Sequence, residues 1–92
     1  MKLKIIYSAH VVIQMFKRGI SEEYIVQILN TGVIIREYPE DRPYPSFLIL
    51  GFRDRTPLHI VYAVNEVGEN VIITAYEPDS ALWNNDYTIK KK

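Results

Sequence analysis

The chain has 92 residues, of which 48% are hydrophobic and 24% are charged. These values are typical of a soluble globular protein, so we expect one domain over residues 1–92 and no disordered segment. The absence of cysteine excludes disulfides, thiolate zinc sites and cysteine nucleophiles. No apolar run reaches the roughly 18 residues that span a bilayer, and no signal peptide is recognisable. We therefore expect a cytoplasmic protein without a membrane partner.

Charge is balanced overall but segregated along the chain. The formal net charge is zero and the pI is about 6.7, which argues against a nonspecific nucleic-acid binder of the histone type. Residues 1–20 carry four bases and no acid, residues 90–92 are all lysine, and residues 66–86 carry five acids and no base. Together the two basic segments would form a face suited to RNA, leaving the acidic segment for a basic partner. Ordinary solvated surface charge is the alternative.

The N-terminal third predicts a short strand followed by two helices. A strand over residues 3–7 ends at Ser8, which can cap the first helix, and Gly19 is placed to end that helix. Ser21 can cap a second helix that ends at residues 30–32. The helical period divides the first helix into two sides. We expect the apolar side to face the core and the polar side to face solvent; the apolar residues are Val11, Val12, Met15 and Phe16, and the polar ones are His10, Gln14, Lys17 and Arg18.

The remainder of the chain predicts four strands. Residues 33–38, 46–53, 58–64 and 71–76 are rich in β-branched and aromatic side chains. Turn residues at 54–57 and 65–70 favour an antiparallel meander. Three prolines in residues 39–45 predict an extended, exposed loop that could line a site. The fold class is therefore α+β, with an N-terminal strand and two helices packed on an antiparallel meander sheet.

Two histidines are the candidates for acid–base chemistry. His10 lies on the first helix and His59 in the third predicted strand. A histidine pair can cleave RNA, because the 2'-hydroxyl must lose a proton and the leaving 5'-oxygen must gain one near neutral pH. Arg18 or Lys17 would hold the phosphate. In the alternative reading, His59 is a hydrogen-bonded structural residue and His10 an ordinary surface residue.

Aromatic and acidic residues complete the candidate set. Tyr76, at the end of the last strand, could stack on a base or donate to a phosphate, although a tyrosine at this position can also fill the core. Trp83 is expected to fold back over the edge of the sheet in a structural role. The carboxylates lack metal-ligand spacing, and no phosphate-binding glycine loop or nucleophile elbow is present, so we expect no metal or cofactor.

An ordered set of short motifs resembles a known family. These motifs are Tyr7-Ser8-Ala9-His10, Arg18-Gly19-Ile20-Ser21, Tyr38 with Pro43-Tyr44-Pro45-Ser46, Pro57-Leu58-His59-Ile60-Val61, and Tyr76-Glu77-Pro78-Asp79 with Trp83. Over nearly its whole length the chain looks like a member of the family called domain of unknown function 4258. The resemblance implies a RelE/barnase-like fold and a similarity to RelE-like ribonuclease toxins of type II toxin–antitoxin systems. It also implies a cognate antitoxin, such as a zinc-finger protein of the YgiT or MqsA kind.

The resemblance assigns roles to individual residues. It places the family's catalytic positions on His10, Arg18, His59 and Tyr76. Two positions depart from the family pattern. Gln14 stands where members commonly have arginine, so full activity would need Lys17 to neutralise the phosphate, and Lys90–Lys92 stand where members often have arginines.

Two hypotheses of different classes follow. The first is a toxin-like, metal-independent endoribonuclease with His10, His59, Arg18 and Tyr76 as catalytic residues and Lys17 and Lys90 on phosphate. The second is a noncatalytic interaction module, a degenerate toxin that binds a small antitoxin-like partner through a sheet edge or the acidic segment 66–86.

Overall fold

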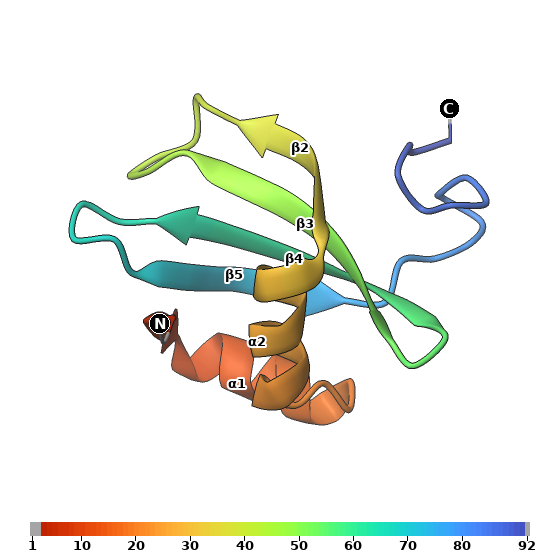
Figure 1. The fold of residues 1–92 in the computed structure, drawn as a ribbon, viewed down its shortest axis with the longest axis horizontal. Helices are drawn as coiled ribbons and strands as arrows, with labels where there is room; N and C mark the ends of the chain where they lie inside the picture. Colours follow the sequence, from red (N-terminus) through yellow and green to blue (C-terminus); the bar gives the residue numbers. More distant parts are fainter. Residues whose placement is uncertain (1–2, 92) are drawn as a thin grey trace.

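The computed structural model describes residues 3–91 and shows five strands and two helices (Figure 1). The α+β class predicted from the sequence is confirmed. In chain order the elements are β1 (Ile5–Tyr7), α1 (Ala9–Lys17), α2 (Glu22–Thr31), β2 (Val33–Tyr38), β3 (Ser46–Arg53), β4 (Thr56–Val64) and β5 (Asn70–Tyr76).

The five strands form one mixed sheet in the order β1-β5-β4-β3-β2. Strands β2 to β5 form the predicted antiparallel meander. The sequence assigned no pairing partner to the N-terminal strand, and the structure adds it to one edge of this meander, where β1 pairs parallel with β5 from Ile5 opposite Asn70 to Tyr7 opposite Ile72. Parallel pairing requires a long crossover connection. Here both helices and three strands separate the two paired segments.

Capping residues mark where both helices begin and where α1 ends. The Ser8 hydroxyl accepts a hydrogen bond from the Val11 amide at 3.1 Å, and the Ser21 hydroxyl accepts one from the Tyr24 amide at 3.5 Å. Both are N-caps, which satisfy amides that the first helical turn leaves free. Gly19 follows α1 with a φ of 65°, a conformation in which glycine carries no steric cost.

The hairpin between β3 and β4 is tighter than expected. Arg53 pairs with Thr56, so only Asp54 and Arg55 form the turn. Asp54 has a φ of 56°, in the left-handed region that two-residue hairpins require. Pro57, assigned from the sequence to the turn, lies within β4 and is buried.

The core lies between the helices and one face of the sheet. Ile25 and Ile28 of α2 and Ile49, Ile60 and Ile72 of the sheet are almost fully buried and belong to one cluster. Figure 1 shows α1 and α2 together on one side of the sheet. The opposite face, here called the helix-free face, carries the residues that alternate with these core residues in each strand.

The predicted core side of α1 is half wrong. Val11 and Met15 are buried as expected, but Val12 is 51% and Phe16 88% exposed. The reason is the position of the helix, which contacts β5 beside the sheet edge. A helix at an edge buries a narrower strip than one lying over the middle of a sheet, so the outer half of the apolar side projects into solvent.

The C-terminal segment packs through its tryptophan. Trp83 is buried and bridges to Lys90, and it covers the helix-free face more than the edge expected from the sequence. The segment runs away from both helices (Figure 1). None of the helices among residues 3–91 is long and apolar enough to cross a membrane.

Gly51 provides a test of the contact between α2 and β3. An alanine Cβ at this position would lie 2.7 Å from Cγ2 of Ile28 and closer still to its Cγ1. We expect Gly51→Ala to lower the free energy of unfolding by about 1–3 kcal/mol, measured by urea denaturation, because the core cannot absorb the added methyl group. In an Ile28→Ala background both clashing γ carbons are gone, so the same substitution should cost clearly less. An equal cost in both backgrounds would contradict the packing described here.

Candidate functional site

Three polar residues of α1 form a connected row on its surface. The Gln14 side chain lies 2.8 Å from Nε2 of His10, one turn before it, and 3.5 Å from Nη1 of Arg18, one turn after it. This i, i+4 spacing brings side chains together along one side of a helix. The sequence predicted that these residues share a side but not that Gln14 connects the other two.

The orientation of the Gln14 amide follows from its partners. Its Oε1 accepts from the Arg18 guanidinium and, at 3.2 Å, from the Thr74 hydroxyl. The Nε2 amino group must then face His10 and donate to it. Nε2 of His10 therefore accepts this hydrogen bond.

Arg18 joins this row to the sheet. Its Nη1 donates to the carbonyl oxygen of Ala75 at 2.7 Å. This carbonyl is accessible because the pairing of β1 with β5 stops at Ile72, which leaves the last part of β5 without a strand neighbour on that side. The row of His10, Gln14 and Arg18, together with Thr74, is called the edge cluster below.

Arg53 holds the chain that follows the edge cluster. Its Nη1 donates to the carbonyl oxygens of Gly19 at 2.6 Å and Arg18 at 3.2 Å, and its Nη2 lies 3.9 Å from the Glu77 carboxylate. These contacts satisfy carbonyls at the C-terminal end of α1, where a cation is favourable. Arg53 thus links the end of α1 to the end of β5.

His59 lies on the helix-free face and is completely buried. Its Nε2 donates to the Tyr87 carbonyl at 2.8 Å, and its Nδ1 accepts from the Tyr76 hydroxyl at 3.2 Å. The Trp83 ring meets the imidazole edge to face at a centroid distance of 4.4 Å. Both ring nitrogens are therefore engaged, and the segment around Trp83 and Tyr87 closes the ring off from solvent.

Burial determines the titration of this pair. It lowers the pKa of His59, because a charged imidazolium is costly away from water, and the bond to the Tyr87 carbonyl opposes this effect only in part. Burial also raises the pKa of Tyr76, with a smaller contribution from the neighbouring Tyr38 phenol. The pair is thus held as a neutral imidazole and a neutral phenol.

The predicted site residues therefore fall into two groups. His10 and Arg18 belong to the exposed edge cluster, whereas His59 and Tyr76 face each other across β4 and β5. The groups adjoin in the chain, since the carbonyl held by Arg18 belongs to Ala75, the residue before Tyr76.

The predicted phosphate-binding lysines are both exposed. Lys17 lies at the end of α1, and Lys90 lies in the C-terminal segment, where it bridges to Trp83. Lys2 and Lys92, which contribute to the basic segments, lie outside the described residues. The C-terminal segment runs away from both helices (Figure 1), so the prediction that the fold unites the two basic segments on one face is wrong for the described residues.

Sequence reasoning missed three residues of these groups: Thr74, Arg53 and Tyr87. Thr74 could have been identified from its position two residues before Tyr76, because residues two apart in a strand lie on the same face. Arg53 donates to backbone carbonyls, and Tyr87 contributes its own backbone carbonyl. No sequence pattern indicates such contacts. Among residues 3–91, no three His, Asp or Glu side chains lie close enough together to form a metal site.

The buried His59 predicts a pH dependence of stability. Because its pKa is lowered in the folded protein, the unfolded chain takes up a proton first, and the free energy of unfolding falls as the pH decreases below about 6.5. Urea denaturation at about pH 7.5 and about pH 5 should show a loss of at most about 1.4 kcal/mol per pH unit from this residue. The His59→Gln variant, which has no titrating group there, should lose less over the same range; equal losses would contradict the assignment.

Comparison with known proteins places the chain in a family. The model of the domain of unknown function called DUF4258 matches residues 7–77, which include the edge cluster and the pair of His59 and Tyr76. No curated protein and no solved structure matches the chain. The match ends at Glu77, before the segment that covers His59. With 71 of its 92 residues in the match, this chain belongs to the DUF4258 family.

Proposed function

We propose that this protein is a toxin-like, metal-independent endoribonuclease with a RelE/barnase-like arrangement of its active site. The observation that carries the proposal is the edge cluster, in which one amide connects an exposed imidazole to an exposed guanidinium. An imidazole can move a proton near neutral pH, and a guanidinium offers two parallel donors to phosphate oxygens. Cleavage of a phosphodiester needs both.

The chemistry assigns a step to each group. Nε2 of His10 turns from the Gln14 amide to the substrate and removes the proton of the 2'-hydroxyl, and that oxygen attacks the adjacent phosphorus while the bond to the 5'-oxygen breaks. The guanidinium of Arg18 stabilises the negative charge that builds on the phosphoryl oxygens, and Lys17 adds a point charge nearby. The leaving 5'-oxygen takes a proton from a general acid; His59 is the other histidine candidate, and it must be uncovered and protonated before it can act.

Gln14 has a positioning role in this proposal. It cannot neutralise a phosphate as an arginine would, but its amide fixes both neighbours. The bond from its amino group orients the His10 ring, and its Oε1 contacts Arg18 and Thr74. Pre-orientation of the two groups lowers the entropic cost of reaching the transition state.

The first test combines growth and RNA integrity. The wild-type chain expressed in a bacterial host should slow growth and cleave cellular RNA, whereas the His10→Ala, Arg18→Ala double variant should do neither. With purified protein, His10→Ala should lower the cleavage rate by about 10²–10⁴-fold, the usual effect of removing a general base. Cleavage products resolved on a sequencing gel provide the measurement.

The control for this test is Arg55→Ala. Arg55 is an exposed arginine in the turn between β3 and β4, so its loss changes the net charge equally without touching the edge cluster. Its activity should match that of the wild type. Unimpaired growth and intact RNA with the wild-type chain would sink the proposal, and so would equal rates for His10→Ala and Arg55→Ala.

A second candidate function is a noncatalytic module that binds an antitoxin-like partner. It is favoured by one observation, the complete burial of His59 with both nitrogens engaged, because a general acid must reach its substrate. Co-purification with the product of a neighbouring gene discriminates between the candidates. A stable complex whose released chain leaves RNA intact supports the module, and cleavage by the released chain supports the ribonuclease.

A further inference from the structure

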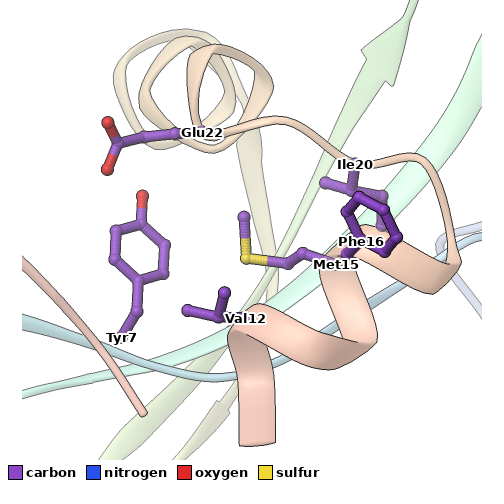
Figure 2. Close-up of a pocket in the computed structure, with 6 residues that line it drawn as sticks. All are labelled: Tyr7, Val12, Met15, Phe16, Ile20 and Glu22. Atoms are coloured by element: carbon purple, nitrogen blue, oxygen red, sulfur yellow. The ribbon is translucent and has the colours of Figure 1, made fainter. Parts of the chain in front are cut away.

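An apolar pocket of about 370 Å³ opens on the side of α1 away from the edge cluster (Figure 2). It lies between β1, α1 and the start of α2. Its lining residues are Tyr7, Val12, Met15, Phe16, Ile20 and Glu22. Four of these six are hydrophobic aliphatic or phenylalanine side chains, so the pocket offers mainly nonpolar contact.

The apolar surface extends beyond the pocket itself. Phe16 is 88% exposed, and Val12 and Ile13 on the same helix are each more than half exposed. A single exposed apolar residue is ordinary, but a cluster of them beside a pocket is typical of a surface that binds another protein. An exposed phenylalanine at a pocket rim can also serve as an anchor for a partner.

The polar groups of the pocket are both oxygens. The Tyr7 hydroxyl is buried and has no hydrogen-bond partner within residues 3–91, and the Glu22 carboxylate points toward it (Figure 2). Burial, with the proximity of this carboxylate, raises the pKa of Tyr7 to about 12. A buried polar group without a partner is costly, and a carboxylate with exposed Glu23 beside it adds negative charge.

No cation of the described chain neutralises this pair of glutamates. Within residues 3–91 the only ion pair joins Arg53 to Glu77, and Lys17, next to Phe16, pairs with neither glutamate. Within residues 3–91 the pocket therefore offers an apolar wall and a carboxylate that no cation neutralises. Charge complementarity therefore indicates an occupant that brings an apolar side chain and a cation.

We propose that this pocket is a docking site for a partner polypeptide that inserts an apolar side chain against Phe16 and Val12 and places an adjacent lysine or arginine between the Tyr7 hydroxyl and the Glu22 carboxylate. The cation donates to both oxygens and so satisfies the buried hydroxyl. The site is separate from the edge cluster, which lies on another side of α1. It therefore stands whether or not the chain cleaves RNA.

The test selects peptides from a displayed library of random sequences on the purified, full-length protein. The enriched peptides should carry a hydrophobic residue next to lysine or arginine. The dissociation constant of the best peptide, measured by fluorescence anisotropy, should rise about tenfold or more for Phe16→Ser and for Glu22→Lys, as for removal of an anchor and reversal of a paired charge. Both residues are exposed, so circular dichroism should show folded variants.

Matched controls lie in the turn between β4 and β5. Val67→Ser and Glu66→Lys likewise replace an apolar residue by serine and a glutamate by lysine at exposed positions, and the affinity should stay within about twofold of the wild type, as for positions outside a binding surface. The proposal is overturned if no peptide is enriched, if the enriched peptides lack cations, or if the pocket variants bind as the wild type does.

A second copy of the chain is the competing occupant. The C-terminal segment itself presents an exposed Ile89 followed by Lys90, which is the same chemistry. Light scattering at increasing protein concentration measures self-association. A wild-type oligomer that Phe16→Ser converts to a monomer would assign the pocket to the chain's own tail and overturn the proposal of a separate partner; a wild-type monomer supports it.

Discussion

The parallel pairing of β1 with β5 determines where α1 lies. β1 ends at Tyr7, opposite Ile72, and α1 begins two residues later, so the helix runs beside the part of β5 that β1 leaves unpaired. The Ala75 carbonyl on that edge would otherwise lack a strand partner, and Arg18 satisfies it. The polar and the apolar surfaces of α1 both depend on this position.

One side of α1 carries the hydrogen-bonded row of His10, Gln14 and Arg18, and another side carries apolar side chains that are exposed to solvent. Gln14 and Arg18 reach Thr74 and the backbone of β5 only because the helix lies at the edge. For the same reason, Phe16 projects into solvent beside the pocket that Tyr7 lines. The edge position thus separates a hydrogen-bonded polar row from an exposed apolar surface, within one short helix.

The C-terminal segment gives the helix-free face a different character. It lies beyond the part of the chain that matches the family, yet it supplies the carbonyl and the indole that enclose His59. Enclosure holds this imidazole neutral and hydrogen-bonded, whereas His10 stays exposed. Two histidines that look equivalent in composition therefore have opposite environments, and any shared role in acid–base chemistry needs Trp83 and Tyr87 to move away from His59.

The sequence by itself determined the local structure. Serine caps placed the starts of both helices, and the β-rich runs located β2 and β3 with their correct bounds, because capping and alternation depend on near neighbours. The tertiary structure alone decided the parallel edge strand, the exposure of Phe16, the bridging role of Gln14 and the enclosure of His59. These depend on contacts between residues far apart in the chain, such as Gln14 with Thr74 and His59 with Tyr87, and helical or strand periodicity carries no information about such pairs.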